Sequence, residues 1–382
     1  MKKAFVANGI DRLGIVDKIL SGRRVGLMTN QTGVNRDLQS TIDILRSLYD
    51  LRVLFAVEHG LRGDIQAGAE VKDEIDPVTG LPVYSAYGKN RALSQEMRDA
   101  FDVLVFDIQD VGLRFYTYIY SLSFAMQACA EIGKPIIVLD RVNPLGGKTE
   151  GIVLDKRIRS FVGAYELPTR YGMTIGEYSE YVKDYLKLDL DLTVVRLAGW
   201  KRNMLLDDTD LPWVPTSPNC PSLETALCYA GTCIFEGTNV SEGRGTTVPF
   251  QMIGAPWING RDLEAQITEQ ETPGIRFRQA SFRPTFSKYR EESCSGVQMH
   301  IQDRDLAEPV SAGLMLLDTI RSMYPEEFKF VKNKKNGKYF IDALLGTSAY
   351  RRGTRSVEEI LRRNREKVKQ FEKRTQKFRF YQ

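Results

Sequence analysis

The stretch LRVLFAVEHG, residues 51–60, joins a short apolar run directly to two ionisable side chains, Glu58 and His59. Short apolar runs bounded by polar residues are typical of strands buried on both faces of a parallel sheet. Similar runs recur before and after this one. We therefore predict strands at 24–29, 51–57, 102–106 and 135–139, and a further strand at 192–197.

Helical patterns alternate with these strands. Residues 38–49 and 118–132 carry apolar side chains at three- and four-residue spacing, which predicts one apolar face on each helix. Thr174 and Glu177 have the spacing of a capping box, which predicts another helix from there to about residue 186. Because strands and helices alternate, we expect the N-terminal part to be a doubly wound α/β sheet.

A second domain is expected from the length, because one hydrophobic core rarely serves more than about 250–300 residues and this chain has 382. The segment DDTDLPWVPTSPNCP, 207–221, is rich in Pro, Asp and Ser, which is typical of a linker. A strand pattern at 296–303 and helix patterns at 310–323 and from Ser356 follow it. We predict an α/β domain at 1–228 and a smaller α+β domain at 229–382.

Several kinds of site are excluded by residue counts and motifs. The two histidines, His59 and His300, are too few for a multi-histidine metal site. The five cysteines are an odd number without a C-x-x-C pair, which argues against a disulfide framework and a zinc knuckle. The motifs for a P-loop, a dinucleotide fold and a serine-hydrolase elbow are missing. We therefore expect no metal and no cofactor.

The charge is unevenly distributed along the chain. Residues 328–382 hold 17 Lys and Arg but 5 Asp and Glu, although the whole chain has a net charge of +4. Without a nucleic-acid motif, this basic tail is typical of a solvated helix face, although an anionic polymer would suit it. We expect no nucleic-acid partner and no membrane span, since no run of about 18 apolar residues occurs. No pattern bears on oligomeric state.

The N-terminal residues MKKAFVANGIDRL, 1–13, lack the continuous apolar region of a secretion signal. As written, the chain is therefore predicted to be cytoplasmic. Removal of a preceding signal would leave the same sequence, and the protein would then be periplasmic or secreted.

Polar side chains follow four predicted strands at their carboxyl ends. Such ends meet at one edge of an open parallel sheet, and ligands bind there. We therefore predict the functional site at this edge. The side chains, in chain order, are Asn30, Gln31 and Thr32, then Glu58 and His59, then Asp107, Gln109 and Asp110, then Asp140, Arg141 and Asn143.

Glu58 is the leading catalytic candidate, because the apolar run delivers its carboxyl group directly to the sheet edge. A partly buried carboxyl suits a general acid. The structural alternative is a carboxylate bound to Arg62 or to a nest of backbone N–H groups. His59 should point to the opposite face of the strand unless the chain turns there, as Gly60 would allow.

Two carboxylates, Asp107 and Asp110, follow the third strand. They are candidate ligands for a divalent cation, although a third ligand is not evident. For Asp110 we favour a different role, binding sugar hydroxyls or Arg114.

The glycine-rich segment FEGTNVSEGRGTT, 235–247, is the second concentration of possible chemistry. Its glycines allow tight turns, and Glu236, Asn239, Glu242 and Arg244 supply donors and acceptors. Such a loop closes over a ligand or is simply a polar surface loop. Glycoside hydrolysis needs an acid and a second carboxylate or equivalent group, and Glu58 with Glu236, Glu242 or Asp110 would supply such a pair. Aromatic surface for sugar faces is available from Tyr84, Tyr87, Tyr116, Tyr118 and Trp257.

Several long strings make the sequence similar to the exo-β-N-acetylmuramidase family, once classed as a domain of unknown function. The similarity runs from about residue 24 to the C-terminus. The strings are MTNQTGV (28–34), EHGLRGD (58–64), DPVTGLPVYSAYG (76–88), FDIQDVGLRFYTYI (106–119), LDRVNPLGG (139–147), SPNCPSLETALCYAGTCIFEGTNVSEGRGTT (217–247), FRPTFSKY (282–289) and FIDALLGT (340–347).

The resemblance implies a Rossmann-like N-terminal domain, a smaller C-terminal domain and a cleft between them. It implies release of terminal β-linked N-acetylmuramic acid from non-reducing ends of peptidoglycan fragments, with Glu58 as catalytic acid and Glu242 among the other site residues. We expect a second carboxylate, Glu242 or Glu236, or the 2-acetamido group of the substrate to assist at the anomeric carbon. The lactyl carboxylate of such a sugar needs a cation, for which Arg244 or Arg62 is expected. The expected substrate-binding set is Asn30, His59, Arg62, Asp64, Gln109, Asp110, Arg114, Tyr116, Asn219, Asn239 and Arg244.

Two alternatives remain open at this point. One is a non-catalytic protein that binds peptidoglycan or muropeptides without cleaving them. The other is a metal-dependent hydrolase that uses Asp107 and Asp110.

Overall fold

The computed structural model describes residues 3–66, 72–86, 94–333 and 337–382. The first lobe is built on a seven-stranded sheet with the order β3-β4-β2-β1-β5-β6-β9, parallel except for β3. The predicted α/β sheet is confirmed. Its strands are β1 (Arg24–Thr29), β2 (Asp50–Ala56), β3 (Glu74–Ile75), β4 (Pro82–Ser85), β5 (Val103–Asp107), β6 (Ile136–Leu139) and β9 (Leu192–Val195).

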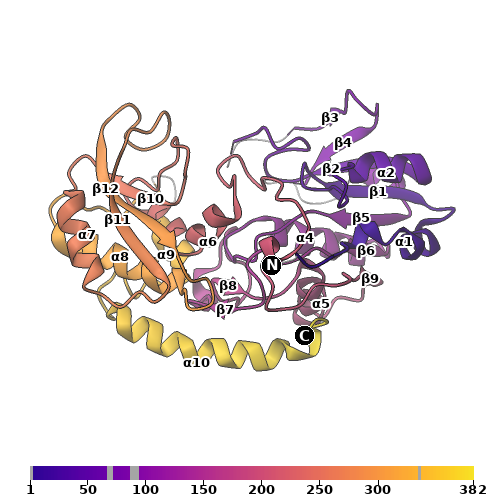
Figure 1. The fold of residues 1–382 in the computed structure, drawn as a ribbon. Helices are drawn as coiled ribbons and strands as arrows, with labels where there is room; N and C mark the ends of the chain where they lie inside the picture. Colours follow the sequence, from indigo (N-terminus) through magenta and orange to yellow (C-terminus); the bar gives the residue numbers. More distant parts are fainter. Residues whose placement is uncertain (1–2, 67–71, 87–93, 334–336) are drawn as a thin grey trace.

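Alternating side chains along these strands fill two cores, one on each face of the sheet. In β5, Val103 and Val105 belong to the core beneath α1 and α2, whereas Leu104 and Phe106 belong to the core beneath α4 and α5. Helices thus cover both faces, as a doubly wound sheet requires (Figure 1). The helices of this lobe are α1 (Leu13–Leu20), α2 (Thr41–Leu48), α3 (Gln95–Asp99), α4 (Tyr118–Glu131) and α5 (Ile175–Leu186).

The helix starts follow from capping side chains. Thr174 accepts a hydrogen bond from the backbone of Glu177, and the Glu177 carboxylate accepts one from the backbone of Thr174, so the predicted capping box is present. Ser40 caps α2 by accepting a hydrogen bond from the Ile42 backbone. These caps supply acceptors for helix N–H groups that have no partner within the helix.

The second lobe has a three-stranded antiparallel sheet in the order β10-β12-β11, with helices packed against it (Figure 1). This arrangement confirms the smaller α+β part. The boundary between residues 228 and 229 stays a prediction, and α6 runs through it. The elements are α6 (Leu223–Thr232), the 3-10 turn η4 (Cys233–Gly237), β10 (Met252–Ala255), α7 (Gly260–Thr268), β11 (Ile275–Phe282), β12 (Cys294–Ile301), α8 (Pro309–Met323) and α9 (Phe340–Leu345).

The last helix, α10 (Val357–Thr375), extends beneath both lobes (Figure 1). It packs first against α8 and against β7 (Thr149–Glu150), which forms a two-stranded antiparallel sheet with β8 (Arg170–Tyr171). Near its end Phe371 contacts Tyr181 of α5 edge-on, and the backbone N–H of Phe380 then donates to the buried Glu177 carboxylate at 2.7 Å. The C-terminus is therefore anchored in the first lobe.

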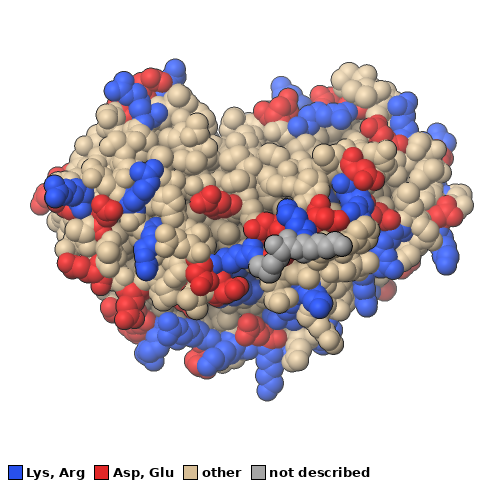
Figure 2. All heavy atoms as spheres, in the orientation of Figure 1, with Lys and Arg blue, Asp and Glu red and all other residues tan. Residues whose placement is uncertain are grey.

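Charged side chains are mixed along the lower edge of the molecule, where α10 lies (Figure 2). Arg363 pairs with Glu359, and Lys377 pairs with Asp184 of α5. Within the described residues no helix is both long and apolar enough to cross a bilayer.

Candidate active site

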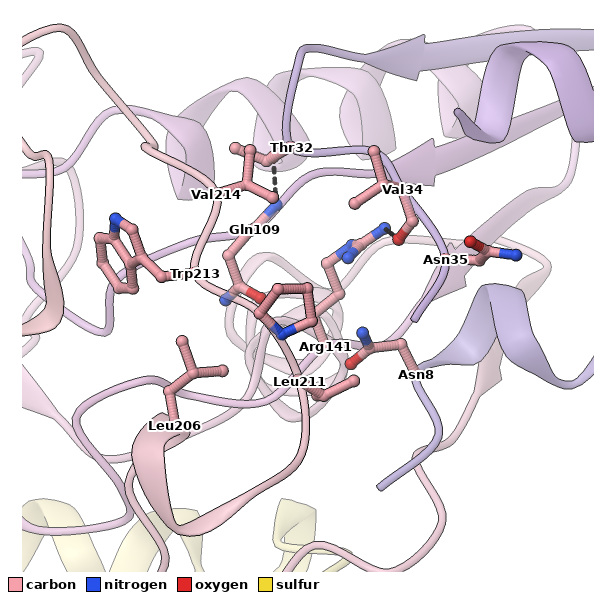
Figure 3. Close-up of a pocket in the computed structure, with 11 residues that line it drawn as sticks. Asn8, Thr32, Val34, Asn35, Gln109, Arg141, Leu206, Leu211, Trp213 and Val214 are labelled. Atoms are coloured by element: carbon pink, nitrogen blue, oxygen red, sulfur yellow. Dashed lines mark hydrogen bonds between the residues drawn. The ribbon is translucent and has the colours of Figure 1, made fainter. Parts of the chain in front are cut away.

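Doubly wound sheets bind ligands where the strand order reverses, which here is the gap between β1 and β5. Side chains fill this position (Figure 3). Arg141 donates to the two carboxylate oxygens of Asp107 at 2.6 and 2.8 Å and to the Val34 carbonyl at 2.8 Å, and residues 211–214 line the other side. About 20 Å³ remains, which is room for one water molecule. A sugar does not fit there.

A larger cavity, of about 290 Å³, lies one strand further along the sheet edge, at the end of β2. Side chains of both lobes line it. Glu58 comes from the first lobe, whereas Glu236 and Arg244 come from the glycine-rich loop of the second. The full lining is Glu58, His59, Phe115, Tyr116, Thr117, Tyr118, Phe161, Val162, Ser217, Tyr229, Glu236, Arg244 and Phe340.

Glu58 is held at the cavity wall by its place in the chain and by a neighbouring loop. β2 ends at Ala56, and the half-buried Glu58 follows two residues later. The Thr117 hydroxyl, from the loop that precedes α4, donates to the Glu58 carboxylate. Thr117 therefore fixes the orientation of this carboxylate.

His59 lines the same cavity as Glu58 because the backbone turns at this point. His59 itself has a φ of 73°, a conformation unusual for a residue with a side chain, and Gly60 has a φ of 74°. The ring nitrogen Nδ1 lies 2.7 Å from the Ile65 carbonyl oxygen. The chain therefore turns at this point, which was the predicted condition for His59 to stay at the site. The buried ring is held by its contact with the backbone.

The second-lobe wall is a network of two carboxylates and two cations. Arg244 donates to Glu236 at 2.8 Å, and its Nε lies 3.4 Å from Glu242, which also accepts from Lys288 at 2.8 Å. Burial raises the pKa of Glu236; Arg244 opposes this effect, and Glu242 adds to it. Of the three carboxylates predicted as partners for Glu58, Glu236 lines the cavity, whereas Glu242 and Asp110 do not.

Aromatic rings form much of the remaining wall. Tyr118 and Tyr116 donate hydrogen bonds to the backbone oxygen and the hydroxyl of Thr216, at 2.5 and 2.7 Å, and their rings meet edge-on at 5.1 Å. Burial raises the pKa of both phenols well above the usual value, so both stay neutral. Such rings suit the apolar face of a sugar.

Two other aromatic candidates, Tyr84 and Trp257, lie outside the cavity. Tyr84 packs against Phe55, and Trp257 donates to the Tyr289 hydroxyl at 3.0 Å. Tyr87 lies outside the described residues.

Several predicted substrate ligands lie outside the cavity and bind protein groups instead. Arg62 pairs with Asp76 at 2.7 Å, not with Glu58, and Asp64 is exposed. Asn239 joins its loop to the backbone of Glu327 and Lys329 at 2.9 and 2.7 Å.

The three remaining amide side chains that were predicted to bind substrate, Asn30, Gln109 and Asn219, also lie outside the cavity lining. Asn30 accepts hydrogen bonds from Thr32, and Gln109 donates to the carbonyls of Asp110 and Val142. Asn219 is buried beside Ser217, with its amide 3.5 Å from Gln66.

Asp110 and Arg114 do not pair with each other. Asp110 accepts hydrogen bonds from Tyr171 and from the Gly112 backbone, and burial raises its pKa to about 6 against the effect of these bonds. Arg114 is fully buried and donates to the carbonyls of Ala343 and Leu344, at the C-terminal end of α9, at 3.3 and 2.8 Å. Of the two roles predicted for Asp110, the contact with Arg114 is therefore wrong, because each residue has other hydrogen-bond partners.

Two family models together match most of the chain. The family model described as exo-beta-N-acetylmuramidase NamZ, N-terminal, matches residues 25–224, and its C-terminal counterpart matches residues 227–381. This chain belongs to the exo-β-N-acetylmuramidase NamZ family. The resemblance predicted from the motifs is confirmed.

Members of the NamZ family and related structures are similar to this chain over nearly its whole length. A peptidoglycan beta-N-acetylmuramidase NamZ of Bacillus subtilis (strain 168) is 47% identical over 385 residues, which cover 100% of this chain and 92% of that protein. Two crystal structures of DUF1343 family proteins from Bacteroides fragilis match with TM-scores of 0.89 and 0.78, at 37% and 30% identity. Each match covers 99% of both chains.

Residues that were not singled out as ligands complete the site in this NamZ family member. Thr117, Ser217, Tyr229 and Phe340 line the cavity, and all four fall within the long family-like strings. Their positions in those strings were the only signal that pointed to them. Their side-chain types alone are equally common in cores and turns.

The two candidate metal ligands are committed to other partners. Asp107 accepts hydrogen bonds from Arg141 and Thr41, and Asp110 accepts them from Tyr171 and Gly112. In the part of the chain that the structure describes, no group of three His, Cys, Asp or Glu is arranged to hold a metal ion. The residues present therefore do not favour a metal-dependent hydrolase.

Proposed function

We propose that this protein is an exo-acting glycosidase that releases terminal β-linked N-acetylmuramic acid from the non-reducing ends of peptidoglycan fragments. One observation carries the proposal: Glu58 shares a cavity with Glu236 and Arg244 of the other lobe, in a member of the NamZ family. The volume of about 290 Å³ is at the lower end for ligand pockets, which suits one terminal sugar better than the interior of a glycan strand.

In the proposed reaction, Glu58 donates a proton to the glycosidic oxygen as the bond to the leaving sugar breaks. Positive charge develops at the anomeric carbon, and the ionised Glu236 or the 2-acetamido group of the substrate stabilises it. Arg244 supports the ionised form of Glu236 through their hydrogen bond. Water then completes the hydrolysis.

Arg244 is also the proposed partner of the lactyl carboxylate, in preference to Arg62. A guanidinium has five donors, and contacts with Glu236 and Glu242 engage its Nη2 and Nε. The side chain lines the cavity, whereas that of Arg62 is 48% exposed and pairs with Asp76.

The roles of the two carboxylates are tested with two substrates that differ in their leaving groups. A nitrophenolate leaves readily without a proton, but a sugar alcohol does not. If Glu58 is the acid, Glu58→Gln lowers kcat/KM for a disaccharide by about 10³-fold and for a nitrophenyl β-N-acetylmuraminide far less. Glu236→Gln lowers both rates to a similar degree, because charge at the anomeric carbon develops with either substrate.

Glu131→Gln, at the exposed end of α4, is the matched control and should leave both rates unchanged. Disaccharide turnover by Glu58→Gln equal to that of the unaltered protein would remove Glu58 from the mechanism. Binding of muropeptides by the unaltered protein without release of sugar would instead support the non-catalytic alternative.

A further inference from the structure

Lys288 lies between β11 and β12 and is bonded to the glycine-rich loop at three points. Its ammonium donates to the carbonyls of Phe235 and Val240 at 2.8 and 3.0 Å and to the Glu242 carboxylate at 2.8 Å. An ammonium group has three donors, so these contacts use all of them. Lys288 does not itself line the cavity.

The backbone around Lys288 is held in an unusual conformation. Ser287, Tyr289 and Glu291 have φ angles of 73°, 56° and 62°, in the left-handed region that residues other than glycine rarely adopt. Such conformations persist where surrounding contacts enforce them, and they concentrate at functional sites. Here the Thr285 backbone N–H donates to the Gly245 carbonyl at 2.9 Å, which fixes the connection against the glycine-rich loop.

The contacts of Lys288 lead to Glu236 by two routes. Phe235, whose carbonyl accepts from Lys288, is the residue directly before Glu236. Glu242, which also accepts from Lys288, lies 3.4 Å from Arg244, and Arg244 in turn donates to Glu236 at 2.8 Å. A shift of Lys288 would therefore move both the backbone and the side-chain partner of Glu236.

We propose that Lys288 is a positioning residue of the active site, which holds Glu236 opposite Glu58 by fixing the glycine-rich loop. The inference rests on the proposed function, in which Glu236 is the second carboxylate. Lys288 acts through other residues and does not touch the reacting atoms.

The charge of Lys288 also affects the titration of Glu236. Burial raises the pKa of Glu236, Arg244 lowers it, Glu242 raises it and Lys288 lowers it. Tyr229 and Cys233 also face Glu236, and burial keeps both neutral, while Glu58 and His59 line the same cavity. Loss of the lysine charge should therefore raise the pKa of Glu236.

The test compares Lys288→Met, which keeps much of the apolar stem, with Lys288→Arg, which keeps the charge. Activity that needs ionised Glu236 rises with pH through its pKa. In Lys288→Met we expect kcat to fall about 10- to 100-fold, because small displacements of catalytic groups have effects of this size. We also expect the ascending limb of the pH profile to move to higher pH, and Lys288→Arg to restore the position of that limb.

Lys18→Met, at an exposed position of α1, is the control for loss of a lysine and should match the unaltered protein. The proposal would be overturned if Lys288→Met left both kcat and the ascending limb of the pH profile unchanged. It would also be overturned if Lys288→Arg shifted that limb as far as Lys288→Met does. If circular dichroism shows that Lys288→Met is unfolded, Glu242→Gln takes its place. Removal of that negative charge must move the limb to lower pH, and an unmoved limb overturns the proposal.

Failure of the proposed function would be recognised separately, as an unaltered protein that releases no N-acetylmuramic acid. The role of Lys288 is then measured without turnover. Titration of carboxyl-labelled glutamate by NMR, with the Glu236 resonance assigned through Glu236→Gln, should show a higher pKa in Lys288→Met. Identical titration curves would overturn the proposal.

Discussion

The two arginines proposed for the substrate carboxylate differ in what surrounds them, and this difference can be measured. Arg244 lines the cavity, while Arg62 is paired with Asp76 outside it. Hydrogen bonds to a charged group contribute about 1.5–3 kcal/mol, which corresponds to about 10- to 100-fold in rate. We therefore expect Arg244→Met to lower the preference for a β-N-acetylmuraminide over the matching β-N-acetylglucosaminide, which lacks the carboxylate, by at least about 10-fold.

The measurement is the ratio of kcat/KM for the two nitrophenyl substrates. Comparing the two sugars within each variant cancels losses that affect both, such as disturbance of Glu236. Arg62→Met should leave the ratio unchanged. A lower ratio in Arg62→Met and an unchanged one in Arg244→Met would reverse the assignment.

Single residues were predictable where chain position alone decides their place. Glu58 follows a buried strand, so its location at the sheet edge could be read from the sequence. The hydrogen-bond and ion-pair partners of these residues could not be predicted, because they come from distant segments of the chain. Thr117 reaches Glu58 from 59 residues away, and Arg62 finds Asp76 instead of Glu58.

At the scale of elements, α9 depends on a residue of the other lobe. The fully buried Arg114 donates to the last carbonyls of α9, where the helix dipole favours a cation, and Gly346 ends the helix with a φ of 74°. Phe340, at the start of the same helix, lines the cavity. Arg114 thus helps to set the position of one cavity wall.

We expect Arg114→Met to lower the free energy of unfolding by about 2 kcal/mol, because two buried carbonyls lose their donors while the burial of a charge is avoided. Urea unfolding of Arg114→Met and of Arg23→Met, an exposed position before β1, provides the comparison. Equal midpoints for the two variants would show that Arg114 contributes nothing to stability.

Elements with a clear hydrophobic period could be predicted from the sequence, and very short ones could not. The central strands and the helices α4, α5 and α8 follow their apolar patterns closely. β3, β7 and β8 have two residues each, which is too few for any period. The sequence also predicted that four strand ends meet at one edge of the sheet. It could not predict that Arg141 fills the gap between β1 and β5, because this depends on three-dimensional packing.

For the whole molecule, burial of Asp140 makes stability dependent on pH, and the C-terminal tail opposes this effect. Tyr381 donates to the buried Asp140 carboxylate at 2.5 Å. Burial raises the pKa of Asp140 to about 7, whereas an ordinary aspartate titrates near 3.8. The folded protein therefore holds a proton that the unfolded chain releases, so the contribution of Asp140 to stability declines as pH rises from about 4 to 7.

We expect Tyr381→Phe to reduce the free energy of unfolding more at pH 8 than at pH 5. At pH 8 the hydroxyl donates to an ionised carboxylate, which contributes about 1.5–3 kcal/mol, while the bond to the neutral form at pH 5 contributes about 1 kcal/mol. The bond from the Leu197 backbone to the same hydroxyl is lost at both pH values. Urea unfolding at the two pH values is the measurement, and an equal loss at both would contradict the assignment to Asp140.

The return of the chain end to the first lobe has a consequence during synthesis on the ribosome. Residues near the two termini dock on the same loop, since Ala7 bonds to Ala198 and the Gln382 carbonyl accepts from Arg202. The first lobe is thus translated early, yet its Glu177 and Asp140 carboxylates gain partners from Phe380 and Tyr381, which are translated after the second lobe. The first lobe, although it is translated first, is therefore completed only after the second lobe has been translated.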